Sequence, residues 1–484
     1  MRTFSVRDSG SDGGPVAEPA TVAAGAACRY PDRFLWGVST SAYQIEGGVD
    51  VDGRSPSVWD TFAGRGGTRS RESGAVAADH RHRMADDVAL LARLGIPAYR
   101  FSVAWPRVQP DGRGPASRAG LDFYRALVDE LLDHDIEPVL TLYHWDLPQA
   151  LEDAGGWPVR DTAWRFADYA ALVADALGDR VRRWTTINEP WCAAMLGYAA
   201  GVHAPGRTEP GAAVAAAHHL LLAHGLAVDV LRPRVAPPAE IGITLNPYPV
   251  VATGPGAHDD DAVRRVDGLA NRLCYDPVLR GSYPDDVLDD LRSVSDLSHV
   301  RDGDLTQIAR PVDALGVNYY RRYHVRHRPG ASAPPSEWPG SPGVHVTQPD
   351  DPTTANGWRV EPYGLFESLV RLTTNYDPPP LYVHESGAAF PDEPGPGGRV
   401  LDANRIRYLD AHLRVAHDAI ATGVDLRGFF VWSYLDNFEW AEGYAHRFGL
   451  VHVDFATQAR TPKASATWYA AVAAANALGP GTGP

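Results

Sequence analysis

The chain has 484 residues, of which 44% are hydrophobic and 22% charged, values that are ordinary for a globular protein with a large buried core. It carries 60 Asp and Glu residues against 45 Lys and Arg residues, and the resulting net charge of -15 would repel a phosphate backbone. The composition therefore excludes a largely disordered chain and argues against a nucleic-acid partner.

The cysteines and the N-terminal residues indicate the cellular compartment in which we expect the protein. Cys28, Cys192 and Cys274 are an odd number at wide spacings, which matches neither a disulfide framework nor a zinc site. Arg2 and Arg7 are followed by acidic residues and not by an apolar segment of adequate length, so we expect no secretion signal. No stretch approaches the roughly 20 apolar residues that cross a bilayer. We therefore expect a cytoplasmic protein with no membrane partner.

One folded domain is predicted at residues 29–476, between disordered tails at residues 1–28 and 477–484 that are rich in small residues, Gly and Pro. Within it, short apolar runs alternate with longer segments of helical period, such as 84–94 and 121–132, which is typical of βα units around a parallel sheet. Eight runs are predicted as strands, in chain order 34–39, 98–103, 138–143, 184–187, 241–245, 314–317, 381–383 and 428–432. A closed barrel and an open doubly wound sheet both fit this alternation.

The residues at the ends of the runs distinguish the two folds. Each run ends in, or is followed by, side chains able to bind sugar or do chemistry; from the first run to the eighth they are Gln44, Arg100 with Trp105, His144 with Trp145, Asn188 with Glu189, Asn246, Asn318 with Tyr320, Glu385, and Trp432 to Trp440. In a barrel these ends surround one pocket, whereas an open sheet would divide them. We therefore predict an α/β fold, a single (β/α)8 TIM barrel with long βα loops over its C-terminal face. Segments 47–83, 282–311 and 321–361 are expected to form loops that wall the pocket.

Two of these residues suggest glycosidic bond cleavage. That reaction needs one carboxylic acid to protonate the leaving oxygen and a second carboxylate on the opposite face of the sugar ring. Glu189 and Glu385 each end a predicted strand. Either glutamate alone would more often form a salt bridge in a loop, so the hypothesis depends on the pair.

Five longer motifs contain many of the residues at the ends of the predicted strands: FLWGVSTSAYQIEG at 34–47, YRFSVAWPR at 99–107, YHWDLP at 143–148, TINEP at 186–190 and VWSYLDNFEW at 431–440. In this order they resemble the motifs of glycoside hydrolase family 1, the β-glucosidase family. The resemblance extends from about residue 30 to residue 474. Because so many motifs match in the same order, the resemblance is very specific.

The resemblance implies a retaining β-glycosidase, most simply a β-glucosidase that also tolerates galactose or fucose, with Glu189 as general acid/base and Glu385 as nucleophile. It implies that Arg100 and Tyr320 support the nucleophile, and it implies neither cofactor nor metal. The substrate would be a small β-glycoside or oligosaccharide with a terminal non-reducing sugar. The residues implied to surround it are Gln44, His144, Trp145, Asn188, Asn246, Asn318, Tyr320, Trp358, Trp432, Glu439 and Trp440.

Physical reasoning agrees with these roles. A permanently charged Arg100 would hold Glu385 ionised, as a nucleophile must be. Glu189 must donate a proton and later accept one, so its pKa should be raised and then fall once a sugar ester neutralises Glu385. In a retaining enzyme the two carboxyl groups should lie about 5 to 5.5 Å apart.

The chain departs from the family around the nucleophile. Where the family usually has Thr-Glu-Asn-Gly, this chain has His384 before and Ser386 after Glu385; Arg359 replaces a usual acidic residue and Tyr434 a usual leucine. We expect these changes to affect substrate preference and pH optimum, and not the reaction type. Because side chains alternate along a strand, His384 is predicted to point outward, toward the helices.

Three alternatives remain at this stage. A transglycosidase would use the same residues with an alcohol as acceptor. A catalytically silent carbohydrate-binding barrel would need one of the glutamates missing, and both are present. A metal-dependent hydrolase would need a His/Asp cluster at strand ends, and His80 and His82 instead precede a helix and are interpreted as solvated loop residues. The sequence does not decide the oligomeric state.

Overall fold

The computed structural model describes residues 27–329, 335–347 and 353–480. Eight parallel strands close into one barrel in the order β2-β3-β4-β5-β6-β8-β11-β12, with β12 paired to β2. Their bounds are β2 (Leu35–Ser39), β3 (Ala98–Ser102), β4 (Glu137–Tyr143), β5 (Arg183–Asn188), β6 (Glu240–Leu245), β8 (Ala314–Asn318), β11 (Leu381–Ser386) and β12 (Leu426–Trp432). Each contains or overlaps one predicted run, so the predicted closed barrel is confirmed.

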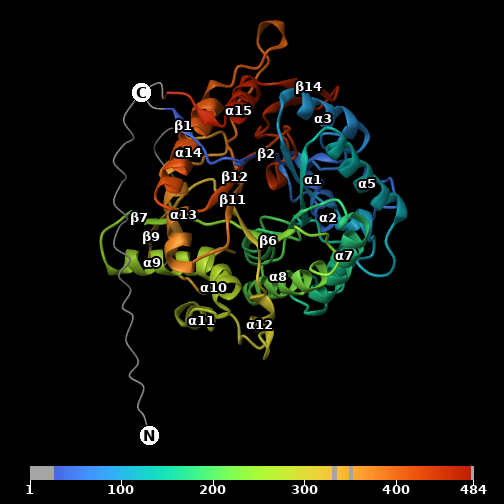
Figure 1. Cartoon of the computed structure of the whole chain (residues 1–484). Coiled ribbons are helices and arrows are strands. Elements are labelled where there is room, and N and C mark those ends of the chain that lie inside the picture. The colour runs from blue at the N-terminus through green and yellow to red at the C-terminus, as the bar shows by residue number, and fades with distance from the viewer. Residues whose placement is uncertain (1–26, 330–334, 348–352, 481–484) are drawn as a thin grey trace.

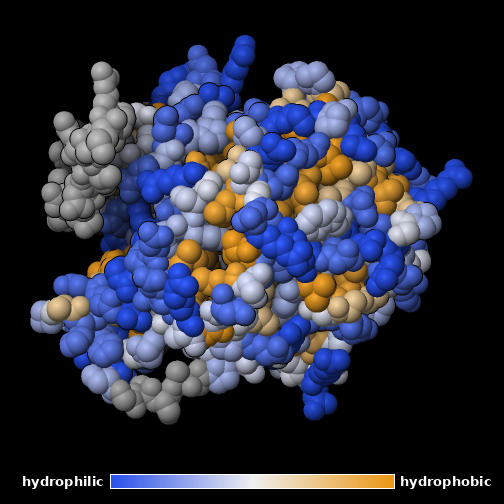
Figure 2. Space-filling view, turned by 90° about the horizontal axis from the view of Figure 1, so that it is seen from below, coloured by the Kyte–Doolittle hydropathy of each residue, from blue (hydrophilic) through white to orange (hydrophobic). Residues whose placement is uncertain are grey.

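A layer of helices surrounds the barrel (Figure 1). One long helix follows each strand: α3 (His80–Leu94), α5 (Arg118–Asp133), α7 (Asp161–Leu177), α8 (Pro210–Leu231), α10 (Leu273–Arg280), α13 (Pro362–Tyr376), α14 (Ala403–Ala421) and α15 (Ala464–Ala475). Helix α5 shows why these segments are helical: Leu121, Tyr124, Leu127, Val128 and Leu131 recur on one face, and all are buried. The outward faces are polar, so hydrophilic residues cover most of the surface in Figure 2, with hydrophobic ones visible in strips between them.

The connections carry shorter elements. They include helices α1 (Ala42–Ile45), α2 (Val58–Gly64), α4 (Trp105–Val108), α6 (Gln149–Asp153), α9 (Ala257–Asp267), α11 (Asp285–Leu291) and α12 (Asp304–Ile308), and helical turns η1 (Arg69–Arg71), η2 (Cys192–Ala199), η3 (Gly268–Arg272), η4 (Pro396–Gly398) and η5 (Trp440–Glu442). A small sheet joins β7 (Val250–Ala252), β9 (Tyr323–His327) and β10 (Val344–Val346), and β13 (Val451–Asp454) pairs with β14 (Ala459–Pro462).

Two of the three long segments predicted as pocket loops line the pocket, and one does not. Segments 47–83 and 321–361 contribute residues to the pocket described below, although they contain α2, η1, β9 and β10. Segment 282–311 contributes none, so its prediction is wrong. It follows α10 and leads into β8, and α12 within it packs against α8 outside the barrel.

Two sequence predictions about hydrophobic and terminal segments are also corrected. Helix α8 has 22 residues and is apolar enough to cross a membrane by length and composition, but 78% of its apolar window is buried against the rest of the protein. At the termini, β1 (Cys28–Arg29) pairs with β15 (Ala477–Leu478), so Cys28 and the pair 477–478 belong to ordered structure and not to tails. The rest of the predicted tails, apart from residues 27, 479 and 480, lies outside the described residues.

Candidate active site

A cavity of about 490 Å³ opens at the C-terminal ends of the barrel strands, and Glu189 and Glu385 are both part of its wall. Its volume lies within the range of about 300–1,000 Å³ that is common for small-molecule sites. Seven of the predicted substrate-binding residues line it: His144, Trp145, Tyr320, Trp358, Trp432, Glu439 and Trp440. The barrel thus brings residues from distant parts of the sequence to one pocket.

The other predicted residues lie behind this wall and contact it. Gln44, on α1, donates its amide to the backbone oxygen of Phe438 at 2.9 Å and to Oε2 of Glu439 at 3.3 Å. Nδ2 of Asn188 lies 3.2 Å from Nε2 of His144. Asn246 donates to the thiol sulfur of Cys192 at 3.3 Å. These residues therefore support the pocket wall in this structure.

Glu385 is held by two donors. Nη1 of Arg100 is 2.6 Å from one carboxyl oxygen, and the hydroxyl of Tyr320 is 2.7 Å from the other. Arg100 is fully buried, and its Nη2 donates to Asn188 at 2.7 Å. Burial raises the pKa of Glu385, while the positive charge of Arg100 and the hydrogen bonds oppose that rise. Sequence reasoning foresaw the cation but not that burial outweighs it.

Glu189 has a different environment. It follows β5 in a left-handed conformation, with φ of 49°, and its backbone N–H donates to the carbonyl of Thr244 at 2.9 Å. Its carboxyl accepts a hydrogen bond from Nδ2 of Asn318 at 2.7 Å. Burial and the negative charge of Glu385 raise the pKa of Glu189 to about 7. Glu189 can therefore hold a proton near neutral pH and also release it.

A third carboxyl group lies across the pocket. Burial and the charge of Glu385 raise the pKa of Glu439 to about 8, against the hydrogen bond from Gln44. At neutral pH Glu439 is therefore mostly protonated and can donate as well as accept. Beside it, the rings of His144 and Trp432 are stacked with centroids 5.7 Å apart, which gives this side of the pocket a flat aromatic surface.

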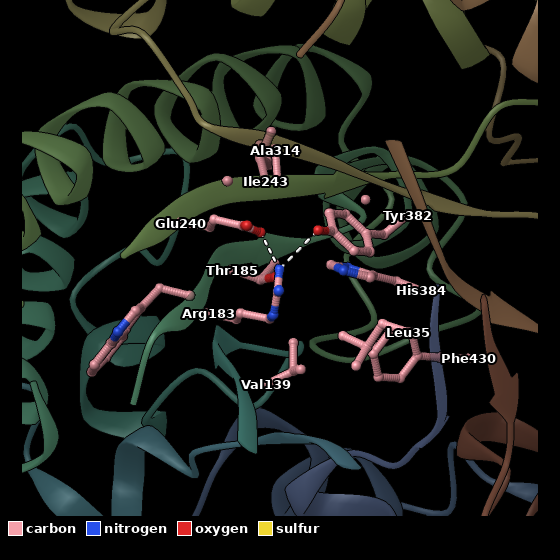
Figure 3. Close-up of a pocket in the computed structure, with 13 residues that line it drawn as sticks. Leu35, Val139, Arg183, Thr185, Glu240, Ile243, Ala314, Tyr382, His384 and Phe430 are labelled. Carbon is pink, nitrogen blue, oxygen red and sulfur yellow. Dashed lines mark hydrogen bonds and ion pairs between the residues drawn. The ribbon is translucent and has the colours of Figure 1, made fainter. Parts of the chain in front are cut away.

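The predicted orientation of His384 is wrong. Its ring points into the barrel, where Nδ1 lies 2.7 Å from Oγ1 of Thr244, and it lines a small internal cavity with Tyr382 and Phe430 (Figure 3). The prediction assumed a regular strand. The pairing of β11 with both neighbouring strands instead shifts register after Val383, so His384 and Glu385 both face the interior.

Ser386 is the residue that faces the helical layer. Its hydroxyl lies 3.5 Å from the hydroxyl of Tyr408 on α14, and Ser386 is still within β11. Neither Ser386 nor His384 lines the main pocket. The two departures from the motifs of the sequence analysis thus lie next to Glu385 without lining the main pocket.

Sequence reasoning missed Cys192 and Thr244. Cys192 lines the pocket, and its thiol forms a hydrogen bond with Glu189. Its position three residues after Glu189 gave no signal for this contact, because Glu189 has a left-handed backbone conformation and does not belong to the helical turn that begins at Cys192. Thr244 carried no signal, since its contacts depend on the pairing of β5 and β6.

The described residues contain no group of three or more His, Cys, Asp or Glu side chains arranged to hold a metal ion. The prediction that His80 and His82 are solvated loop residues before a helix is wrong in part, because both lie in the first turn of α3 and His80 is buried, whereas His82 is exposed. His80 contacts Asp87 at 2.8 Å and His82 contacts Asp79 at 2.6 Å.

Comparisons with known proteins agree on one family. The model of the family described as Glycosyl hydrolase family 1 matches residues 26–478. The chain is 52% identical over 454 residues to the thermostable beta-glucosidase B of Thermobispora bispora, covering 93% of this chain and 91% of that protein. It is 47% identical over 452 residues to the bifunctional beta-D-glucosidase/beta-D-fucosidase of Bifidobacterium breve, covering 91% and 97%.

Solved structures give the same result. The psychrophilic beta-glucosidase of Micrococcus antarcticus superimposes with a TM-score of 0.89 at 50% identity, covering 93% of this chain and 98% of that one. The family 1 beta-glucosidase of Thermotoga maritima superimposes with a TM-score of 0.88 at 42% identity, covering 93% and 99%. The similarity thus extends over nearly the whole chain.

Proposed function

This chain belongs to glycosyl hydrolase family 1 and is a glycoside hydrolase, and from that premise we propose that it is a retaining β-glucosidase. Glu385 is the proposed nucleophile and Glu189 the proposed general acid/base. The observation that carries the proposal is the contrast between the two carboxyl groups. Arg100 contacts Glu385 directly at 2.6 Å, whereas the direct side-chain partners of Glu189 are neutral. One glutamate is therefore suited to be ionised and the other to carry a proton.

In the first step, a carboxylate oxygen of Glu385 attacks the anomeric carbon while the bond from that carbon to the aglycone oxygen breaks. The proton of Glu189 passes to the leaving oxygen. The products are a sugar ester on Glu385, a free alcohol and an ionised Glu189. Tyr320, whose hydroxyl donates to Glu385 at 2.7 Å, orients the attacking carboxylate.

In the second step, water attacks the anomeric carbon and gives a proton to Glu189, and the ester bond to Glu385 breaks. Burial still raises the pKa of Glu189 during this step, but the ester carries no charge, so the additional repulsion from Glu385 is absent. The pKa of Glu189 is then lower than in the free enzyme, which favours its action as a base. One residue thus serves as acid and base in turn.

The proposed glycone is β-D-glucose, since relatives that cover nearly the whole chain are named as β-glucosidases. The Bifidobacterium breve relative is also named as a β-D-fucosidase, so a β-D-fucoside is a second substrate to test. Glu439, with its pKa raised to about 8, would bind a sugar hydroxyl as donor or acceptor. Trp432 would stack against the sugar ring.

Trapping of the covalent intermediate tests this function. Incubation with a 2-deoxy-2-fluoro β-glucoside carrying a good leaving group should add one fluorosugar, and peptide mass spectrometry should find it on Glu385. Ser386→Ala, which changes a neighbour that faces α14, should be labelled as the parent protein is. Labelling of another carboxyl group, or no turnover of any aryl β-glycoside, would refute the proposal.

Two further properties belong to the proposal, the acceptor and the compartment. Water is the proposed acceptor, and adding alcohols to the assay would reveal a transglycosidase by the appearance of alkyl glucosides. The cytoplasm is the proposed compartment, supported by the three cysteines, each of which is buried and free. Fractionation of the source cells would test it.

A further inference from the structure

A hydrogen bond inside the barrel connects β11, which carries Glu385, with β6, the neighbour of the strand that Glu189 follows. Oγ1 of Thr244 on β6 and Nδ1 of His384 on β11 are 2.7 Å apart, and both residues are buried. Strand β8 lies between β6 and β11, so this bond passes over β8. In Figure 3, His384 and Tyr382 point from β11 into the interior of the barrel.

Glycine at position 316 makes the bond possible. Gly316 is the residue of β8 that lies in register with Thr244. A Cβ at this position would lie 2.3 Å from Nδ1 of His384 and 2.4 Å from Oγ1 of Thr244. Any other residue here would therefore push the two side chains apart.

The two ends of the bond are each next to a catalytic residue. The carbonyl of Thr244 accepts the backbone N–H of Glu189 at 2.9 Å, so this threonine contacts Glu189 by its main chain and His384 by its side chain. His384 directly precedes Glu385, and its own carbonyl accepts the hydroxyl of Ser39 at 2.6 Å. The chain at both glutamates departs from regular strand pairing at these points, since β5 shifts register against β6 and β11 against β8.

We propose that the hydrogen bond between Thr244 and His384 is a positioning contact that fixes the separation of Glu189 and Glu385. The proposal rests on the proposed function of the two glutamates. Regular pairing does not determine where either carboxyl group lies, because each glutamate follows an irregular stretch of strand. A single contact that holds both stretches would do so, and displacements of about 1 Å at a reacting group can change rates by about 100-fold.

The test uses Thr244→Val, which keeps the shape of the side chain and removes its hydroxyl. Thr186→Val is the matched control for loss of a buried threonine–histidine hydrogen bond. Oγ1 of Thr186 is 2.7 Å from His224 on α8 and 3.2 Å from the carbonyl of Gly242 on β6, and neither partner lies on β11. We expect Thr244→Val to lower kcat on an aryl β-glucoside about tenfold or more, with a smaller change in KM. Thr244→Ser, which retains the hydroxyl, should recover most of the loss.

The pH profile separates positioning from general destabilisation. Burial and the charge of Glu385 raise the pKa of Glu189, and of these the effect of the charge weakens with distance between the two carboxyl groups. If the contact sets the separation, Thr244→Val should move the alkaline limb of kcat/KM to lower pH, whereas Thr186→Val should leave it in place. The ionisable groups that face Glu189 are Glu385, Arg100, Cys192, Tyr248, Tyr320 and Glu439. Of these groups, only Glu385 is next to Thr244 or His384 in the sequence.

A second pair of variants covers the possibility that Thr244→Val does not fold. His384→Asn keeps a hydrogen-bonding atom near the position of Nδ1, and His384→Leu does not, so only the leucine variant should reproduce the fall in kcat. The inference is overturned if Thr244→Val, or His384→Leu in its place, keeps kcat within about twofold of the parent or behaves like Thr186→Val. If the parent protein itself is not labelled at Glu385 by the fluorosugar, the proposed function fails first. Labelling of the parent combined with unaffected variants would refute the positioning contact alone.

Discussion

Replacing Glu189 by Gln should remove proton donation while preserving the contacts of the site. The side-chain oxygen of Gln can still accept the hydrogen bond that Nδ2 of Asn318 donates to Glu189 at 2.7 Å. Gln is also neutral, as the acid form of Glu189 is, so the environment of Glu385 at the start of the reaction is kept. Any loss of rate can therefore be assigned to the missing proton.

The expected magnitude depends on the leaving group. General acid catalysis contributes about 10²- to 10⁴-fold, and an alkyl glucoside, whose alcohol is a poor leaving group, needs all of it. The dinitrophenolate of a dinitrophenyl glucoside departs without needing a proton, so kcat/KM for that substrate should change far less. Burial and the charge of Glu385 raise the pKa of Glu189 to about 7. For the parent enzyme on an alkyl glucoside, kcat/KM should then fall about 50-fold between pH 7 and pH 9, because the protonated fraction falls from about one half to about one hundredth.

The assay compares kcat/KM for both substrates from pH 5 to pH 9 in the parent and in Glu189→Gln. This parameter reports the first step, in which Glu189 acts as an acid. The variant should lack the alkaline limb on the alkyl glucoside. Equal losses on the two substrates, or an alkaline limb that persists in the variant, would contradict the reasoning.

Three further predictions concern the nucleophile, stability and metals. Glu385→Ala should lower kcat/KM on an aryl β-glucoside by about 10³-fold or more. Ser386→Asn should change kcat/KM by no more than about 12-fold, the value of one hydrogen bond, because Ser386 faces α14. Comparable losses in the two variants would mean that the ordinary family mechanism does not operate. Lys463→Met should lower the free energy of unfolding by about 1.5–3 kcal/mol in urea titrations, because Asp392 and Asp436 lose a buried ammonium donor but keep Arg405 and Arg447 as partners. Arg427→Met, at a half-exposed pair, should lower it by at most about 1 kcal/mol. Activity should survive dialysis against a chelator, and a loss restored by a divalent cation would contradict a mechanism built on carboxyl groups alone.

The strands of the barrel could be predicted from sequence because the signal for each is local. A short apolar run followed by a polar or aromatic cluster marks a buried strand and its C-terminal end, and eight such runs imply closure around one pocket. The same reasoning located Glu189 and Glu385 on that pocket, and the resemblance to the family placed Arg100 and Tyr320 beside Glu385. The roles of these residues remain predictions.

Errors arose wherever a long-range contact decided the outcome. Segment 282–311 was expected at the pocket because of its length, but its packing against α8 depends on a surface formed elsewhere in the chain. His384 was expected to point outward because strands alternate, yet a register shift against two neighbouring strands turned it inward. No pattern within residues 381–386 indicates that shift.

The sequence by itself determined which residues form the barrel and which carboxyl groups end its strands, because hydrophobic period and strand ends are properties of short segments. Only the tertiary structure decided the protonation of those groups, since the pKa of Glu189 depends on burial and on a charge 196 positions away at Glu385. It also decided the geometry between them, because the Thr244–His384 bond forms only when β6, β8 and β11 are adjacent and position 316 has no side chain. Both properties arise from contacts between residues that are distant in sequence, and those contacts exist only once the barrel has closed.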